Sequence, residues 1–359
     1  MGKTALVVSG GGAKGAFAVG AVDFMVNRLG LSFDLIAGTS TGALIAGCLA
    51  AGKLGELITY YSTASTDTML TQRSASQILN SDSVLGSKPL RKVLDGIIDQ
   101  AAADRTLLGS PAIFLTAVGL QTGELFYFHT SDTAIVERPA RGYRLKARNE
   151  LIGAMLASAS VPVMMPPVQV LSKAFDPFFP PEPEGSPAGP VVPDQFIDGG
   201  VREYAPLKIV IDQGATDIYA VILSPLTRRR RNESFTKLLS ILPRSIDTLT
   251  EDVADNDIAS AERTNLLLTK IIKIRRDLIA GGADPALVER VFGSSGTPFN
   301  GKVLVNLRLI APEAPLLKGD SLKFDQFDMS RMMKAGWRRA QMTLDAVQPP
   351  PVPTEPPIV

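Results

Sequence analysis

The sequence predicts an α/β protein whose central sheet is mostly parallel and is covered by helices on both faces. Short apolar runs such as Ala5–Ser9 alternate along the chain with longer segments in which apolar residues have helical spacing. Repeated strand–helix units in this order are typical of parallel sheets with helices on both sides. The composition agrees, because 359 residues with 45% hydrophobic side chains and a net charge of +1 exclude a disordered, collagen-like or coiled-coil chain.

The expected strands are short β-rich or apolar runs, and two of them flank a hairpin-like junction at residues 121–123. In chain order they are Ala5–Ser9, Phe33–Ala37, Ala112–Leu120, Glu124–His129, Ile218–Leu223 and Val303–Leu309. A further short apolar run, Gln195–Ile197, precedes an Asp-Gly-Gly sequence.

The expected helices follow the apolar spacing and the start signals, for example Ser87 and Pro89 at the beginning of one of them. They are Ala13–Leu29, Thr41–Ala51, Leu90–Ile98, Asn149–Ala157, a stretch around Ser245–Ala280, and Met329–Leu344.

No composition shift divides the first 345 residues, so we expect a single domain over residues 1–345. Residues 176–193 are dense in proline and glycine and are expected to form a loop insertion that borders the active site. Residues 346–359 form a proline-rich C-terminal tail. The four-arginine run Arg228–Arg231 leaves two interpretations open, a solvated loop or a peripheral contact with anionic lipid headgroups.

The chain carries no recognisable signal peptide or transmembrane segment, and we expect a cytoplasmic protein unless a specialised system secretes it. A single cysteine, Cys48, excludes an intrachain disulfide framework and suits a reducing compartment. The near-zero net charge gives no global attraction to nucleic acid, and we expect no nucleic-acid partner. The sequence does not decide the oligomeric state.

A glycine-rich turn, Gly10–Gly15, lies between the first strand and the first helix. It matches G-x-G-x-x-G, so a dinucleotide-binding oxidoreductase is one candidate. That function requires an acidic residue at the end of the second strand, whereas Asp34 stands at its beginning. The alternative is a set of backbone N–H groups at a helix N-terminus that hold a phosphate or a transition-state oxyanion.

A second motif, Gly38-Thr39-Ser40-Thr41-Gly42, is G-x-S-x-G between the second strand and the second helix. A nucleophile elbow requires this placement, because a sharp strand-to-helix turn with small neighbours exposes the serine hydroxyl. The motif therefore predicts Ser40 as a nucleophile.

A serine nucleophile requires a proton acceptor, which is usually histidine. The only histidine, His129, ends an aromatic strand and is expected to be structural. A carboxylate remains, and Asp198, followed by Gly199 and Gly200, stands at a strand end, where catalytic groups collect in α/β sheets. No His, Cys or Asp cluster has metal-ligand spacing, so we predict neither a metal nor a cofactor.

In this order the motifs resemble those of the patatin-like phospholipases, which are lipid acyl hydrolases with a Ser-Asp dyad. The similarity covers about residues 4–345 and extends to Ala157–Pro162 with Pro166 and Pro167, and to Gly336-Trp337 near the C-terminus. The resemblance implies a three-layer α/β/α fold around a mostly parallel sheet. It implies hydrolysis of an acyl lipid, phospholipid or other, through an acyl-enzyme, with these residues: Ser40 as nucleophile, Asp198 as proton acceptor, Gly10, Gly11, Gly12 and Gly15 in the oxyanion loop, and Gly38, Gly42, Gly199 and Gly200 as supports of the motifs.

The chain departs from the family pattern beside the expected site. Relatives often carry N-x-P shortly after the aspartate motif, where this chain has Tyr204-Ala205-Pro206. The headgroup and positional preference therefore stay open. Two other functions also stay open, the dinucleotide-binding oxidoreductase and a catalytically silent relative that binds lipid.

Overall fold

The structure is a computed structural model that describes residues 2–133, 135, 140–171, 193–227, 236, 238–292, 303–317 and 321–345. Its centre is an eight-stranded sheet that is mostly parallel, as the sequence predicts. The main path of the sheet runs through β10 (Asn306–Ile310), β9 (Ala215–Val221), β1 (Lys3–Val8), β2 (Leu35–Gly38), β5 (Ala112–Gly119), β6 (Leu125–His129) and β7 (Ala140–Arg144). The last strand, β8 (Phe196–Asp198), pairs with β5 outside this path. Only the pairs β5–β6 and β5–β8 are antiparallel among the described pairings of this sheet.

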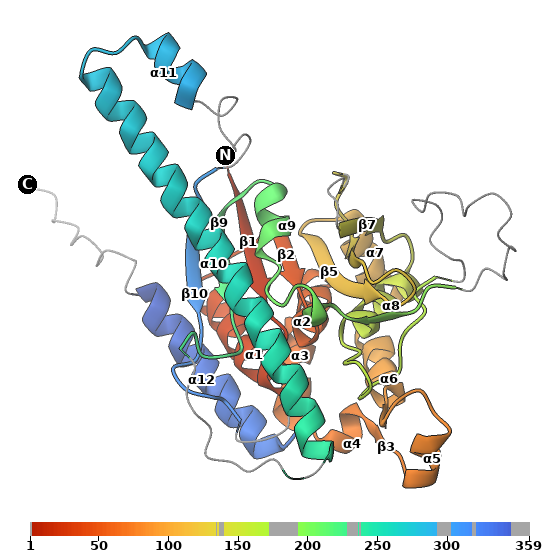
Figure 1. Ribbon diagram of the computed structural model, residues 1–359. Coiled ribbons are helices and arrows are strands. Elements are labelled where there is room, and N and C mark those ends of the chain that lie inside the picture. The colour runs from red at the N-terminus through yellow and green to blue at the C-terminus, as the bar shows by residue number, and fades with distance from the viewer. Residues whose placement is uncertain are drawn as a thin grey trace, which may run out of the picture.

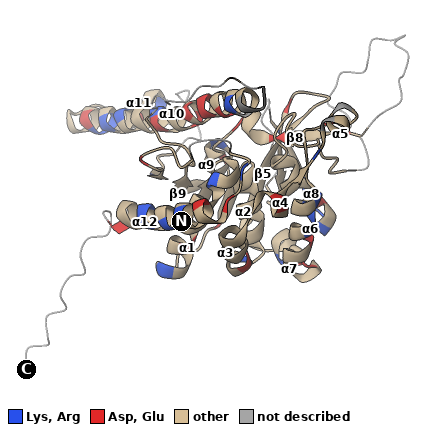
Figure 2. Cartoon of the chain, turned by 90° about the horizontal axis from the view of Figure 1, so that it is seen from below, with Lys and Arg blue, Asp and Glu red and all other residues tan. Residues whose placement is uncertain are grey.

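Both faces of the sheet are buried, which gives the three layers that the sequence predicts. Along β1, Leu6 and Val8 belong to one apolar core, whereas Ala5 and Val7 belong to a second core on the opposite face. Because successive side chains of a strand point to opposite faces, a continuously apolar strand serves both cores. Figure 2 shows the layers, with α10 (Leu238–Ala280) above the sheet and α1 (Gly15–Asp23), α3 (Leu54–Thr63) and α7 (Gln100–Leu108) below it.

The larger core includes the N-terminal and C-terminal helices, which pack closely together. α12 (Gln326–Asp345) lies along α1, and glycines make the contact possible. A Cβ atom at Gly20 would collide with the carbonyl oxygen of Met333, and one at Gly336 with that of Phe17. Beyond this contact, Trp337 packs edge-on against Phe24 with ring centroids 4.8 Å apart.

The other expected elements are confirmed with small shifts of their ends, among them α2 (Thr41–Ala50), α6 (Lys88–Ile97) and α8 (Arg148–Ser158). The helix expected over Ala13–Leu29 is divided into a 3-10 turn, α1 and a π-helical turn over Phe24–Arg28. The structure also contains elements that the sequence did not predict: α4 (Thr66–Met69), β3 (Thr71–Gln72), α5 (Ala75–Leu79), β4 (Leu85–Gly86), α9 (Leu207–Asp212) and α11 (Pro285–Phe292), together with α3, α7 and β7.

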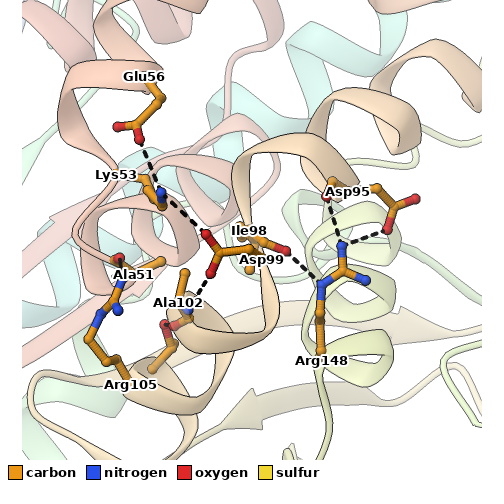
Figure 3. Close-up of polar contacts among 10 residues, drawn as sticks. Ala51, Lys53, Glu56, Asp95, Ile98, Asp99, Ala102, Arg105 and Arg148 are labelled. Carbon is orange, nitrogen blue, oxygen red and sulfur yellow. Dashed lines mark hydrogen bonds and ion pairs between the residues drawn. The ribbon is translucent and has the colours of Figure 1, made fainter.

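Polar contacts fasten the helix ends beneath the sheet (Figure 3). Asp99 precedes α7 and accepts a hydrogen bond from the N–H of Ala102 at 2.7 Å, and Lys53 lies 3.7 Å from the same carboxylate. Arg148, at the start of α8, donates to the carbonyl oxygen of Ile98 at 2.6 Å, where α6 has just ended. Donors that reach exposed carbonyl groups at helix C-termini satisfy groups that the helix itself leaves unpaired.

The longest helix, α10, has 43 residues and lies on the side of the sheet opposite α1 and α3 (Figure 2). Figure 1 shows one end of α10 beyond the lower ends of the strands, whereas its other end continues past the sheet to α11. The first half of α10 therefore lies near the carboxyl ends of the parallel strands. None of the helices in the described residues is long and apolar enough to cross a membrane.

Candidate active site

Ser40 occupies a sharp turn between β2 and α2. Its backbone has φ 57° and ψ −125°, a left-handed conformation that a non-glycine residue rarely adopts and that costs about 1–3 kcal/mol. The turn requires glycine on both sides, because a Cβ at Gly38 would collide with the carbonyl oxygen of Gly42 and a Cβ at Gly42 with that of Val8. Strain held in place by such close packing is typical of a functional site.

The segment 157–162, at the end of α8, fastens both sides of the site. The N–H of Ser40 donates to the Oγ of Ser158 at 2.9 Å. Two residues further on, the carbonyl oxygen of Ser160 accepts a hydrogen bond from the N–H of Asp198 at 2.8 Å. One segment thus holds the backbones of Ser40 and Asp198 relative to each other.

The sheet topology explains why these two residues meet. β2 pairs with β5 up to Gly38, which lies opposite Leu115, and then leaves the sheet at the Ser40 turn. β8 pairs with β5 a little further along, where Asp198 lies opposite Ala117. Because β6 occupies the other edge of β5, β8 takes the position that β2 vacates. This replacement brings Asp198 to the end of β2.

Burial controls the charge of Asp198. Its pKa is raised from 3.8 to about 6, because desolvation outweighs the hydrogen bonds with the Ser40 side chain and the N–H of Gly200, which lower it. The N–H of Gly200 donates to the Asp198 Oδ1 at 2.8 Å. Near pH 7 the carboxylate is therefore mostly ionised, yet more basic than an exposed aspartate. The preceding residue, Gly199, packs so closely on Thr116 that a Cβ would collide with its hydroxyl.

The glycine-rich turn lies beside Ser40, and its members differ in their contacts. Gly11 and Gly12 line the same cavity as Ser40, and in the described part of the chain neither of their N–H groups donates a hydrogen bond. The N–H of Gly10 donates to the carbonyl oxygen of Tyr204, whereas Gly15 packs against Thr41 beneath the turn. Only Gly11 and Gly12 of this set therefore present open N–H groups near Ser40.

Two cavities meet at Ser40. The Ser40 cavity contains Asp198 and the two open glycines, and its described lining residues are Gly11, Gly12, Ser40, Val161, Pro162, Met164, Asp198, Val201, Tyr204, Ile246, Asp247, Thr250, Ser321 and Leu322. The apolar cavity lies on another side of Ser40, and its described lining residues are Gly12, Ser40, Thr41, Leu44, Met69, Leu70, Leu90, Ala159, Val161, Met165, Leu322 and Phe324. Ser40 lines both cavities, and the Ser40 cavity adds Asp198, Asp247 and Thr250 to a lining that is otherwise mainly apolar.

The segment Tyr204-Ala205-Pro206, where relatives often carry N-x-P, is part of this site. Tyr204 is buried and lines the Ser40 cavity, and the N–H groups of Tyr204 and Ala205 both donate to the Asp257 Oδ2, at 3.0 and 2.9 Å. Asp257 belongs to α10, so this helix fixes the segment that accepts the hydrogen bond from Gly10.

A buried acid lies next to this segment. Glu203 accepts a hydrogen bond from the Tyr127 hydroxyl at 2.5 Å, and burial raises the pKa of Glu203 to about 8. Its carbonyl oxygen accepts a hydrogen bond from the hydroxyl of Thr39, the residue before Ser40. The Glu203 side chain lines neither cavity at Ser40, so it supports the turn rather than facing a ligand there.

His129 is buried at the end of β6, stacks on Phe114 and lines neither cavity at Ser40. Burial lowers the pKa of its imidazole, so the ring is neutral near pH 7. Asp34 accepts a hydrogen bond from the N–H of Thr4 at 2.8 Å, at the start of β2 and away from the glycine turn. The position of His129 does not fit a catalytic base for Ser40, and the position of Asp34 does not fit the acidic residue that a dinucleotide-binding oxidoreductase needs.

Neither the single cysteine nor a metal site contributes to this part of the structure, as far as the described residues show. Cys48 is buried in α2, and burial raises the pKa of its thiol to about 12, so it stays protonated. Among the described residues, no group of three or more His, Cys, Asp and Glu side chains is arranged to hold a metal ion.

Three sequence predictions lie wholly or mostly outside the described residues. They are the loop insertion 176–193, of which only Pro193 is described, the Arg228–Arg231 run and the tail 346–359.

Sequence reasoning missed the side chains that support the site. The block Ala157–Pro162 resembles the family pattern and so points to Ser158, but no pattern indicates that the Ser158 Oγ accepts a hydrogen bond from the N–H of Ser40. Asp257 and Asp247 come from a helix about fifty residues beyond Asp198, and no motif pointed to them.

Comparisons with known proteins identify the family of the chain. The search of curated proteins found no match. Among solved structures, the crystal structure of VipD from Legionella pneumophila is similar with 13% sequence identity and a TM-score of 0.38, and the match covers 96% of this chain and 67% of that chain. A family model described as patatin-like phospholipase matches residues 6–211, more than half of the chain, which includes the glycine turn, the Ser40 turn and Asp198. The chain is therefore a member of the patatin-like phospholipase family.

Proposed function

We propose that the protein is a lipid acyl hydrolase in which Ser40 and Asp198 form the whole side-chain catalytic machinery. The observation that carries this proposal is that Ser40, on a strained strand-to-helix turn, and the buried Asp198 line the same cavity, where the Ser40 side chain lowers the pKa of Asp198. The family supports an acyl-lipid substrate.

In the first step, the Ser40 Oγ attacks the carbonyl carbon of the lipid ester while its proton passes to the Asp198 carboxylate. The tetrahedral intermediate collapses, the ester C–O bond breaks, and the leaving alcohol takes the proton from Asp198. A water molecule then attacks the acyl-enzyme, with Asp198 again accepting a proton. The fatty acid leaves, and the proton returns to Ser40.

Negative charge on the carbonyl oxygen needs donors that other groups do not occupy. The N–H groups of Gly11 and Gly12 meet this requirement, whereas that of Gly10 is already used. One such donor is typically worth about 3–4 kcal/mol of transition-state stabilisation. The N-terminus of α2, directly after Ser40, adds a favourable field for the same charge.

The apolar cavity, which encloses about 30 Å³, would receive the part of the acyl chain next to the ester carbonyl. Ser40 lines it together with the apolar side chains of Leu44, Met69, Leu90, Met165 and Phe324. An ester carbonyl held between this cavity and the Ser40 cavity would lie beside both the nucleophile and the open glycines.

Three variants test the proposal on vesicles of a fluorescent phospholipid and on a soluble p-nitrophenyl ester. We expect Ser40→Ala to abolish hydrolysis of both substrates and Asp198→Asn to lower kcat by at least about 10³-fold. His129→Gln serves as the control and should keep most of the activity. Activity lost in His129→Gln but kept in Asp198→Asn would overturn the dyad in favour of a histidine mechanism.

The same experiment separates the two other functions. A catalytically silent lipid-binding relative would bind the vesicles without hydrolysing either substrate. An oxidoreductase would bind NADH, which a thermal shift on adding the cofactor would reveal.

A further inference from the structure

A carboxylate of α10 holds the backbone beside the active site without facing a ligand there. The Oδ2 of Asp257 accepts hydrogen bonds from the N–H groups of Tyr204 and Ala205, at 3.0 and 2.9 Å. Two N–H groups bonded to one carboxylate oxygen fix both the position and the orientation of this dipeptide, and bonds to a charged acceptor are the stronger ones. Asp257 is not among the described lining residues of either cavity at Ser40. It therefore acts on the backbone and not on a substrate.

The segment that this carboxylate holds reaches two turns of the site. The carbonyl oxygen of Glu203 accepts a hydrogen bond from the hydroxyl of Thr39 at 3.0 Å, in the nucleophile turn. The carbonyl oxygen of Tyr204 accepts one from the N–H of Gly10 at 3.1 Å, in the glycine-rich turn. Two consecutive carbonyl groups thus set the position of the glycine-rich turn relative to the nucleophile turn.

The side chain of Tyr204 adds a second contact with the glycine-rich turn. Its ring lies so close to Gly10 that a Cβ there would come within 2.7 Å of it, and a Cβ at Gly200, two residues after Asp198, would come within 3.1 Å. Tyr204 also lines the Ser40 cavity. A displacement of Tyr204 would therefore be passed on to Gly10.

The glycine-rich turn depends on such anchors, because glycine restricts its own backbone less than any other residue. Gly11 and Gly12, whose N–H groups are open in the described part of the chain, directly follow the anchored Gly10. On their other side, the N–H of Ala13 donates to the carbonyl oxygen of Ser321 at 2.7 Å. An oxyanion donor acts only over a narrow range of positions, and a misplacement of about 1 Å costs up to about 10²-fold in rate. Loosening the anchor at Gly10 should therefore slow the reaction.

We propose that Asp257 is a positioning residue of the reaction: through the backbone of Tyr204, it sets the position of the two open glycine N–H groups relative to Ser40. The proposal rests on the proposed function, which uses these N–H groups as oxyanion donors. Asp257 lies beyond residue 211, where the family match ends. The oxyanion donors of the matched region thus depend on a helix outside it.

Steady-state kinetics on the soluble p-nitrophenyl ester at pH 8 test the positioning role. Burial raises the pKa of Asp257 from 3.8 to about 7, so its carboxylate is mostly ionised at pH 8. Asp257→Ala removes the acceptor and should lower kcat at least about tenfold with KM within about twofold of wild type, because an oxyanion contact forms only in the transition state. Asp257→Asn keeps an acceptor oxygen at the same place and should retain kcat within about threefold. Glu262→Ala, at an exposed acidic residue of the same helix, is the control and should behave as wild type.

A second truncation covers the case in which Asp257→Ala does not fold. Asp257→Ser keeps a polar group, but its shorter side chain leaves the two N–H groups out of reach, so it should show the same loss of kcat. Unchanged kcat in a folded truncation variant, an equal loss in Asp257→Asn and in the truncation, or a rise in KM in place of the fall in kcat would overturn the proposal.

Hydrogen exchange tests the anchor separately from catalysis. Mass spectrometry of peptides that span residues 9–15 follows the amide of Gly10, which exchanges slowly as long as Tyr204 accepts its hydrogen bond. We expect this amide to exchange at least about tenfold faster in Asp257→Ala, and at the wild-type rate in Asp257→Asn and Glu262→Ala. Faster exchange of Gly10 in a protein whose wild type hydrolyses no ester would confirm the anchor and reject the proposed function. Hydrolysis by the wild type, with exchange and kcat both unchanged in Asp257→Ala, would reject the positioning role alone.

Discussion

Replacing Asp198 by asparagine should stabilise the folded protein at pH 8, although the same substitution should abolish most of the activity. Burial raises the pKa of Asp198 from 3.8 to about 6, a difference of about 2 units. Each unit corresponds to about 1.36 kcal/mol, so keeping this carboxylate ionised in the folded state costs about 3 kcal/mol at pH 8. Asparagine carries no charge, and its Oδ1 can still accept the hydrogen bond from the N–H of Gly200.

The sign of the pH dependence follows from the direction of the shift. Because the pKa of Asp198 is higher in the folded than in the unfolded protein, the favourable contribution of its protonated form is present at low pH and is lost as the pH rises through about 6. The advantage of Asp198→Asn should therefore grow from less than about 1 kcal/mol at pH 4 to about 3 kcal/mol at pH 8. With an unfolding entropy of about 0.7 kcal/mol/K for a chain of this size, 3 kcal/mol corresponds to about 4 °C in Tm.

Urea unfolding and thermal melting at both pH values measure this effect, with Asp104→Asn on the exposed surface of α7 as the control. The wild-type kcat/KM should rise with one-proton dependence through about pH 6, because only the ionised carboxylate accepts the Ser40 proton. An Asp198→Asn variant that is no more stable than wild type at pH 8, or whose advantage is the same at pH 4, would refute the reasoning.

Two further substitutions examine the Ser40 turn. Gly42→Ala should destabilise the protein by more than about 3 kcal/mol or prevent folding, because the added Cβ meets the backbone of Val8. The control Gly55→Ala, on an open face of α3, should leave the free energy of unfolding unchanged or raise it by up to about 1 kcal/mol. Urea unfolding compares the two variants, and equal stability would contradict the packing argument. Ser158→Ala leaves the N–H of Ser40 without a partner and should cost about 1–3 kcal/mol while lowering kcat. Ser160→Ala is the matched control for Ser158→Ala, because Asp198 contacts the backbone of Ser160 and not its hydroxyl. If kcat falls equally in both variants, Ser158 does not position Ser40.

The sequence was sufficient for the fold class and for most long elements, because their signals are local. A continuously apolar strand such as β1 indicates that both of its faces are buried, and the G-x-S-x-G motif predicts a strand-to-helix turn. The exchange of β2 for β8 along β5 could not be predicted in this way. It depends on pairing between segments about eighty residues apart, for which the chain carries no local signal.

The site was predictable in its motifs but not in its supports. Ser40 and Asp198 belong to recognisable patterns, whereas Asp257 is one of several acidic residues in α10, and only the folded chain brings it to the N–H groups of Tyr204 and Ala205. The sequence also could not show that the N–H of Gly10 donates a hydrogen bond whereas that of Gly11 stays open. This difference depends on the carbonyl oxygen of Tyr204, which is far away in the sequence. Lys14 is buried and lines a cavity together with residues of α10 and Ser321, and no sequence pattern indicated this position.

The central claim is that Ser40 forms the covalent intermediate with Asp198 as its only side-chain base. Labelling with a fluorophosphonate, followed by intact-mass measurement and peptide mapping, tests it most directly. We predict one adduct per chain, on Ser40, at a rate that rises through about pH 6, with no adduct in Ser40→Ala and a strongly slowed reaction in Asp198→Asn. An adduct on another residue, or labelling of Ser40 at an undiminished rate in the folded Asp198→Asn variant, would contradict the account.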